Sequence, residues 1–405
     1  MWSRAQSLFA LPGPRAVVSA SVAATIGVLP VFLLGALAVL IRADLGVSEA
    51  HMGVAVATFF GAAAVTSAHM GRLVERLSAP RALALGASSS GLVLAGLATT
   101  GSYGALLRWM AAAGVATSLS QLGANLKLAG AVPAARQGLA FGIKQAAIPG
   151  ATLVAGVTVP TIALTIGWRW VFVVTAVMSL VVAVVQLRGP QGQRRVKAST
   201  VPVPTRLHRP SLGVLAAAAG LGAATATAMG AFVVEYAVSI DIDAGVAGWV
   251  LGIGGLSAIL SRVAMGGLAD RRDGGNLLVT TGMMAVGAVA VAAFPHVTTV
   301  MPLAVITVLA YAIGWGWAGL FNFAIVRRHR DAPAAATGIT QIGVYAGGVT
   351  GPIVFGLLVT NLGYGAAWTV GAAAMFTAAG LMAVGRSMAR RSWHRGDAQA
   401  LPSGP

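Results

Sequence analysis

The sequence has no cysteine and few charged residues. Because none of the 405 positions is Cys, disulfide bonds, thiolate metal sites and cysteine nucleophiles are excluded. Charged residues make up 9% of the chain, against about 25% in a typical soluble domain. Hydrophobic residues make up 57%, and the mean hydropathy is +0.83. A chain with so little polar surface belongs in a lipid bilayer.

Acidic residues are scarcer than basic ones, and the placement of the basic residues predicts the topology. The chain has 27 Lys and Arg against 10 Asp and Glu. Most of the basic residues lie in alternate connections and in both tails. Lys and Arg collect on the cytoplasmic side of membrane proteins, so we expect both termini in the cytoplasm and a location in the cytoplasmic membrane. Nucleic-acid binding is disfavoured because it needs a clustered basic face.

Long apolar runs alternate with short connections along the chain. A spanning helix needs about 20 mostly apolar residues. The only long connection, 188–210, is polar and contains several prolines, which is typical of a flexible linker. The predicted fold class is an all-α integral membrane protein with twelve spans near 16–41, 52–69, 82–100, 104–127, 138–162, 170–187, 211–237, 247–264, 277–296, 299–324, 335–360 and 366–386.

Several short motifs occur twice at nearly constant spacing. GRLVER at 71–76 recurs as GGLADR at 266–271, and GIKQ at 142–145 recurs as GITQ at 338–341. Gly53 and Gly248 precede the first pair of motifs at one offset. Paired membrane repeats are typical of secondary transporters, whose substrate lies between the halves. The expected units are a bundle at 1–187, a cytoplasmic linker at 188–210, a bundle at 211–386 and a cytoplasmic tail at 387–405.

With twelve spans in two parallel halves and a Gly-x-x-x-acid-Arg loop after the second and eighth, the chain resembles the major facilitator superfamily. The first loop departs from the pattern, since Glu75 replaces the usual Asp and Ser78 stands where Gly is common. The resemblance implies two pseudo-symmetric six-helix bundles that work as a monomer by alternating access. It also implies a latch between the halves, formed by Gly71, Glu75, Arg76, Gly266, Asp270 and Arg271.

Ionisable residues inside the predicted spans are candidates for function. Lys144 lies about six residues into the fifth span, and an anionic substrate would explain a cation at that depth. Snorkelling of the side chain to the head groups is the favoured explanation for Lys127, whereas for Arg108 and Arg262 it stands level with a functional role. No Asp or Glu lies near the middle of a span, and Glu235 is close to a helix end. A coupling proton stays among the alternatives, but the sequence identifies no residue that would carry it.

Uncharged polar and aromatic residues complete the predicted substrate site. Gln145 and Gln341 occupy equivalent positions in the two repeats and could bind one substrate from both sides, although interhelical hydrogen bonding explains them as well. The resemblance implies that the first, fourth, seventh and tenth spans line a central cavity. The predicted substrate-binding residues are Lys144, Gln145, Gln341, Arg108, Asn125, Tyr311, Trp315, Asn322 and Tyr345.

The preferred function is transport of a small organic anion, with membrane lipids as the other partners. The alternative is efflux of drugs or lipophilic cations by the same fold, and a transport-inactive sensor ranks below both. An enzyme is not expected, because the six His residues are scattered and no phosphate-cradling loop or catalytic triad is visible. No cofactor and no metal site are predicted.

Overall fold

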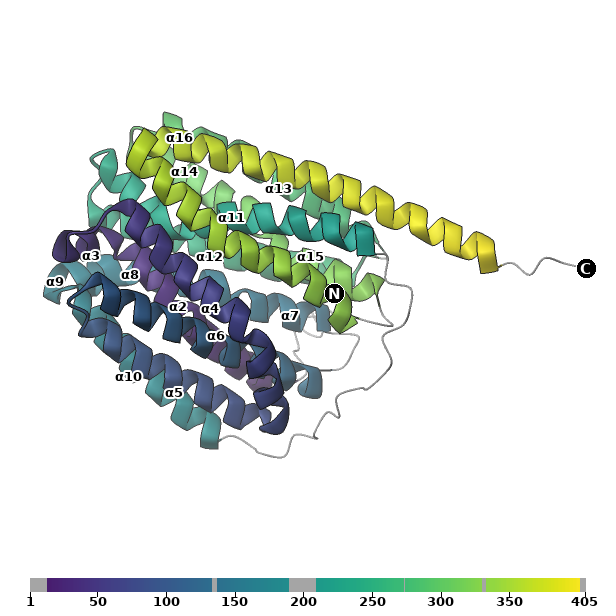
Figure 1. Cartoon of the computed structure of the whole chain (residues 1–405), viewed down its shortest axis with the longest axis horizontal. Coiled ribbons are helices and arrows are strands. Elements are labelled where there is room, and N and C mark those ends of the chain that lie inside the picture. The colour runs from purple at the N-terminus through teal and green to yellow at the C-terminus, as the bar shows by residue number, and fades with distance from the viewer. Residues whose placement is uncertain (1–12, 133–136, 189–208, 273, 330–332, 401–405) are drawn as a thin grey trace, which may run out of the picture.

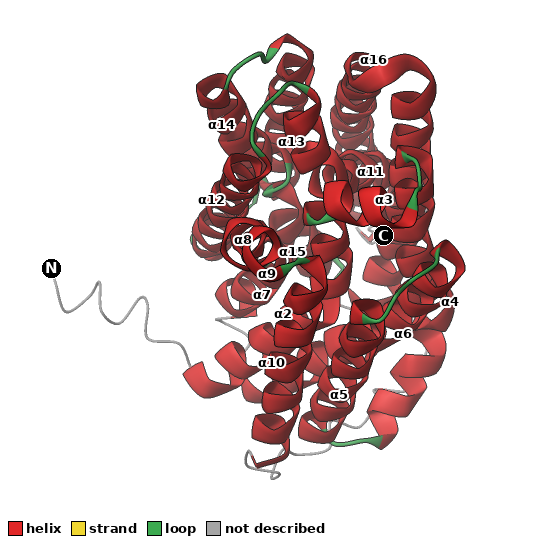
Figure 2. Cartoon of the chain, turned by 90° about the vertical axis from the view of Figure 1, so that its left-hand side faces the viewer, coloured by secondary structure: helices red, strands yellow, loops and turns green. Residues whose placement is uncertain are grey.

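The computed structural model describes residues 13–132, 137–188, 209–272, 274–329 and 333–400. This part of the chain consists of helices joined by short loops and contains no strand (Figure 2). The predicted linker at 188–210 falls almost entirely outside the described residues. The predicted all-α class is confirmed.

Helices of the first half form six spans. The first is divided into two helices at Leu37, and the fifth is divided near Ala146 and again by a π-helical turn. The bounds are α2 (Pro14–Ala36), α3 (Ala38–Leu45), α4 (Glu49–Arg76), α5 (Ala79–Ala98), α6 (Tyr103–Ala131), α7 (Gln137–Gln145), α8 (Ala147–Thr158), η2 (Val159–Ala163), α9 (Leu164–Ile166) and α10 (Trp168–Arg188).

Helices of the second half form the other six spans. A π-helical turn interrupts the tenth span, and α16 contains two spans that meet at Gly363, where φ is 80°. Glycine adopts this backbone conformation without the steric cost that other residues meet. The bounds are α11 (Arg209–Ser239), α12 (Ala244–Asp270), α13 (Asn276–Ala293), η3 (Phe294–His296), α14 (Val300–Leu309), η4 (Ala310–Gly314), α15 (Trp317–Arg328) and α16 (Pro333–Ala400).

Ten helical stretches of the described residues are long and apolar enough to cross a membrane. One of them, Ala336–Arg391, has 56 residues and holds two spans. Helix α6 is absent from the ten and is the twelfth span; it carries polar residues along its length, including Gln121 and Asn125. The twelve predicted spans are therefore present. The structure continues α16 through Ala400, so the predicted tail at 387–405 is helical as far as that residue.

Contacts between helices occur both within each half and between the two halves. Helix α5 packs against α10 and α6, and α11 packs against α16. Figure 1 shows α5 and α10 at one edge of the molecule and α16 at the opposite edge, with the colours of the two halves separated. Between the halves, α4 contacts α16, α8 and α7 contact α12, and α2 contacts α11.

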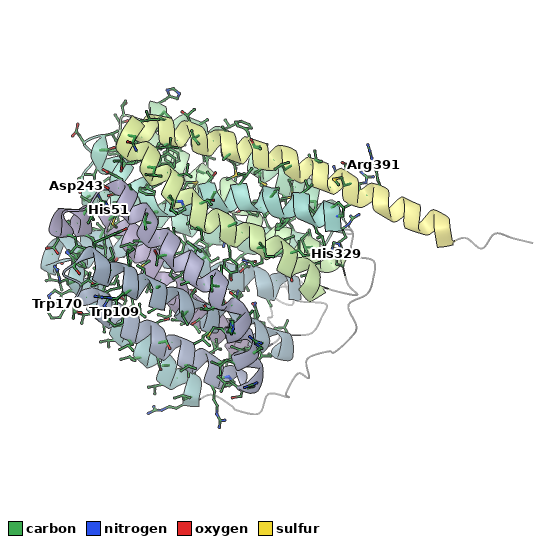
Figure 3. All side chains as sticks on the ribbon, viewed as in Figure 1. His51, Trp109, Trp170, Asp243, His329 and Arg391 are labelled. Atoms are coloured by element: carbon green, nitrogen blue, oxygen red, sulfur yellow. The ribbon has the colours of Figure 1, made fainter. Side chains whose placement is uncertain are left out.

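Two ends of the bundle are distinguished by their connections. We call the end that carries residues 46–48 and 240–243 the outer end, following the prediction from charge, and the opposite end the inner end. Figure 3 shows His51 and Asp243 near the outer end, and His329 and Arg391 toward the other.

Glycines that mark the sequence repeat lie at equivalent contacts between the halves. A Cβ on Gly53 would clash with the carbonyl oxygen of Pro352, and a Cβ on Gly248 would clash with the carbonyl oxygen of Gly156. Positions 156 and 352 are 196 apart, which is the repeat offset of the GIKQ motif. Both contacts therefore obey one pseudo-two-fold axis, and both need glycine because small residues let membrane helices approach closely.

The pseudo-symmetry is lost at the inner end. There Gly142 of α7 lies against α12, where an added Cβ would be 3.4 Å from the Cα of Gly266. The equivalent position on α16, Gly338, has open space around it. One of the two equivalent interfaces is thus closed along its length, whereas the other separates toward the inner end.

Candidate functional site

Two basic side chains are buried at similar depth where α7 meets α12. Lys144 lies seven residues after the start of α7, and Arg262 lies eight residues before the end of α12, so each is about 10–12 Å from its helix end at 1.5 Å per residue. Lys144 is 5% exposed and Arg262 is 1% exposed. The sequence placed Arg262 too close to a helix end, because α12 continues to Asp270 rather than stopping at 264.

Arg262 donates hydrogen bonds to both halves of the protein. Its Nη1 donates to the carbonyl oxygen of Gln145 at 2.5 Å, and its Nη2 donates to the carbonyl oxygen of Trp315 at 3.1 Å. Pro149 explains why the first carbonyl is free, since proline has no N–H to bond the residue four positions earlier. Trp315 lies where the tenth span is broken between η4 and α15. Arg262 therefore satisfies carbonyls at two helix breaks, as a membrane interior requires.

Few described contacts offset the positive charge of the Lys144 ammonium group. Its only described hydrogen bond is a long one of 3.5 Å to Oε1 of Gln145. The three ion pairs among the described residues involve neither Lys144 nor Arg262. Instead, the two cations repel each other electrostatically. Burial of an uncompensated charge is costly, so this pair forms a region of positive potential that an anion would neutralise.

Aromatic rings from both halves lie beside the basic pair. The guanidinium carbon of Arg262 is 5.6 Å from the ring centroid of Trp315. Phe32 of α2 approaches Trp315 from the other half, with ring centroids 5.6 Å apart. Tyr311 packs edge-on against Trp315 at 5.2 Å, is fully buried, and has a hydroxyl without a described partner. These rings would bound the apolar part of an organic ligand.

The other predicted binding residues do not form a cluster like that of Lys144 and Arg262. Asn125, Asn322, Gln341 and Tyr345 are partly buried on α6, α15 and α16, and no described hydrogen bond joins Gln341 to Gln145. Arg108 is exposed near the outer end of α6, so the structure separates it from the buried basic pair. The prediction that Arg108 binds substrate has no support from this geometry.

The predicted latch is described only in part. The side chains of Arg76 and Arg271 are exposed, and those of Glu75 and Asp270 fall outside the described residues. Gly266 is buried against α7, whereas a Cβ on Gly71 would reach only Leu122 of its own half, at 4.0 Å. The latch function remains a prediction.

The sequence analysis missed a cluster of ion pairs at the outer end. Arg42 binds Glu49 at 2.6 Å and Glu235 at 2.9 Å. Glu235 lies four residues before the end of α11, close to a helix end as its position suggested, but its side chain is buried and only 1% exposed.

Lys127 also differs from the prediction that it snorkels to the membrane surface. Its Nζ donates to Oγ of Ser19 and to Oε1 of Gln186, which is buried. These bonds join α6 to α2 and α10 within the first half. Lys127 is thus a partnered structural lysine and a useful control for Lys144. No group of three or more His, Asp or Glu among the described residues could hold a metal ion.

Comparison with known proteins agrees with this architecture. The sequence matches the family model of the Major Facilitator Superfamily over residues 20–334. No protein among those of curated function matches the sequence. A structure of a bacterial homolog of the human lysosomal transporter Spinster, inward-facing and occupied, superposes with a TM-score of 0.69 at 12% identity, covering 93% of this chain and 96% of that one. Its inward-facing, unoccupied structure gives 0.67 at 13% identity, with 94% and 97% covered.

Proposed function

Since the chain belongs to the major facilitator superfamily, and is therefore a multi-pass membrane transporter that works by alternating access, we propose that its substrate is a small organic anion. The observation that carries this proposal is the buried, uncompensated ammonium of Lys144 beside Arg262. Both lie at the contact between the two halves, where transporters with repeated bundles bind their substrates.

Lys144 and Arg262 have different roles in this proposal. Lys144 has donors to spare, so its Nζ would bind the anionic group directly, and the side-chain amide of Gln145 would orient it. Arg262 already uses Nη1 and Nη2 on backbone carbonyls. It would act through its charge and through Gln145, whose backbone it holds. Phe32, Tyr311 and Trp315 would contact the organic part of the ligand.

The latch motif and the separation at the inner end are consistent with alternating access. In the described conformation α4 and α16 are in close contact near Gly53 but leave open space near Gly338. A substrate would enter this state from the inner end, between α4 and α16, and would reach the basic pair only where α7 and α12 part. Opening of the outer end would then require the glycine contacts near Gly53 and Gly248 to separate.

Thermal unfolding of the purified full-length protein in detergent tests the charge of the substrate. The panel contains lactate, succinate, citrate, phosphate, glucose, glycine and tetraphenylphosphonium at one ionic strength. A ligand specific for the folded state stabilises it by about 2.7 kcal/mol at 100 times its dissociation constant. We expect stabilisation by one class of carboxylate, absent in Lys144→Ala and retained in Lys127→Ala.

Two other outcomes would contradict the proposal. Stabilisation by tetraphenylphosphonium alone would assign the protein to the efflux of lipophilic cations. Carboxylate stabilisation that persists in Lys144→Ala would show that the basic pair is not the binding site.

A further inference from the structure

Arg42 is a bridge between the two halves at the outer end. It lies in α3 of the first half, and its Nη1 bonds Glu235 of α11 in the second half at 2.9 Å. Its Nη2 bonds Glu49 of α4 at 2.6 Å, and its Nε donates to the carbonyl oxygen of Val47. Two partners of Arg42 thus belong to its own half, and only Glu235 belongs to the other.

Glu235 is the one acidic residue among the described residues that is buried. Its Oε1 accepts from Arg42, but its Oε2 has no described hydrogen-bond partner. The charged and titratable groups that face it are Arg42 from α3, Glu49 from α4 and Tyr364 from α16. Arg42 is the single cation in this set.

The outer end is closed by close backbone contact around this bridge. A Cβ on Gly35 of α2 would lie 2.5 Å from the carbonyl oxygen of Gly230 in α11. The amide of Ala50 donates to Oγ1 of Thr360 across the α4–α16 interface. An outward-open state must separate these helices, and the Arg42–Glu235 ion pair must then break.

Breaking the pair leaves its two members in unequal positions. Arg42 keeps Glu49 and Val47, because they move with the first half. Glu235 loses its only described cation, and a carboxylate in an apolar setting is strongly disfavoured without one. A proton on Glu235 removes this cost, because the neutral acid is favoured by burial.

We propose that Glu235 binds a proton from the outer aqueous phase and thereby releases Arg42 to Glu49, which allows the outer end to open. Deprotonation of Glu235 restores the ion pair and favours closure. Glu235 would thus be the site at which transport is coupled to protons. This inference depends on alternating access and does not depend on the charge of the substrate.

The experiment measures the distance between the halves at the outer end without any ligand. Because the chain has no cysteine, Ala43→Cys and Ser239→Cys provide a unique pair of spin-labelling sites, and both positions are exposed. Pulsed electron–electron double resonance would be recorded on the full-length protein in nanodiscs at pH 8 and pH 5. We expect a short distance at pH 8 and a larger population of long distances at pH 5.

Variants separate a proton switch from a merely structural contact. Glu235→Gln should show the long distance at both pH values. Glu49→Gln should shift the population in the opposite direction, toward the short distance, because Arg42 then has Glu235 as its only carboxylate partner. Asp44→Asn serves as the matched control, because Asp44 pairs with Arg169 of its own half at the same end.

The proposal is overturned if Glu235→Gln keeps the distances and the pH response of the parent protein, since another group would then carry the response. It is equally overturned if Glu49→Gln and Glu235→Gln both lengthen the distance, because both would then only loosen the outer end. Should Glu235→Gln not fold, Arg42→Gln gives the same test, with opening expected at a higher pH than in the parent protein.

Discussion

Two clusters of charge join the halves, and they differ in their balance of signs. At the outer end, one arginine meets two carboxylates, Glu49 and Glu235. Nearer the inner end, Lys144 and Arg262 lie together without any described carboxylate. The outer cluster contains both signs of charge without a ligand, so it can hold one conformation closed. The inner pair is incomplete, so it has a reason to bind an anion.

The largest effect should follow from removing the unpartnered charge. We expect Lys144→Met to abolish stabilisation by the carboxylate that stabilises the parent protein, a loss of about 4 kcal/mol or a thousandfold in affinity. The unliganded variant should melt at a higher temperature, because an uncompensated buried charge is gone. Thermal unfolding with and without the carboxylate measures both effects.

Lys127→Met is the control for this substitution. It removes a lysine that has two side-chain partners, so the unliganded protein should melt at a lower temperature, with stabilisation by the carboxylate unchanged. If both variants destabilise the unliganded protein alike, Lys144 is also a partnered lysine and the comparison fails.

Replacement of Arg262 should destabilise the unliganded protein, whereas replacement of Lys144 should stabilise it. Arg262→Met leaves the carbonyls of Gln145 and Trp315 without donors, and unsatisfied buried groups cost about 1–3 kcal/mol each. We expect the unliganded protein to lose about 3 kcal/mol in thermal unfolding. Arg262→Lys keeps the charge but has no planar group that reaches both carbonyls. Relative to Arg262→Met, it should therefore restore carboxylate binding more fully than it restores thermal stability.

The inner pair can be converted into a balanced cluster like the outer one. Gln145→Glu is nearly isosteric and places a carboxylate where Oε1 already accepts from Lys144. The new carboxylate should compete with the ligand and weaken carboxylate affinity about tenfold, or about 1.4 kcal/mol, as measured by ligand-dependent thermal shift. Gln341→Glu, at the equivalent position of the other repeat, should change affinity less, and an equal loss would indicate that both amides contact the ligand.

Features that depend on local sequence could be predicted before the structure. Span number follows from hydropathy, and the repeat follows from glycines whose spacing reflects contacts between the halves. Lys144 was singled out because a basic residue in an apolar run has a known cost, and its role in binding stays a prediction. The end of α12 was misplaced, because the predicted span stops at 264 whereas the helix continues to Asp270 and packs there against α7.

Features that depend on distant partners could not be predicted in this way. Arg42 and Glu235 are 193 positions apart, and neither has a neighbour in sequence that points to the other. Arg108 and Arg262 looked alike in the sequence, as basic residues near helix ends. In the structure Arg108 is exposed, whereas Arg262 is buried and only 1% exposed. Only the packing of the helices separates the two cases.

The smallest effect should come from the ion pair that lies at the outer end but does not join the halves. Asp44 and Arg169 are 2.7 Å apart with side chains about 40% exposed, and exposed pairs contribute about 0.2–1 kcal/mol. Asp44→Asn should therefore lower stability by no more than that in thermal unfolding. Arg42→Gln, at the same end, should cost more at pH 8, because Glu235 is left buried without a cation. Equal losses would mean that burial of Glu235 adds nothing, and the outer cluster would then be no more than a surface ion pair.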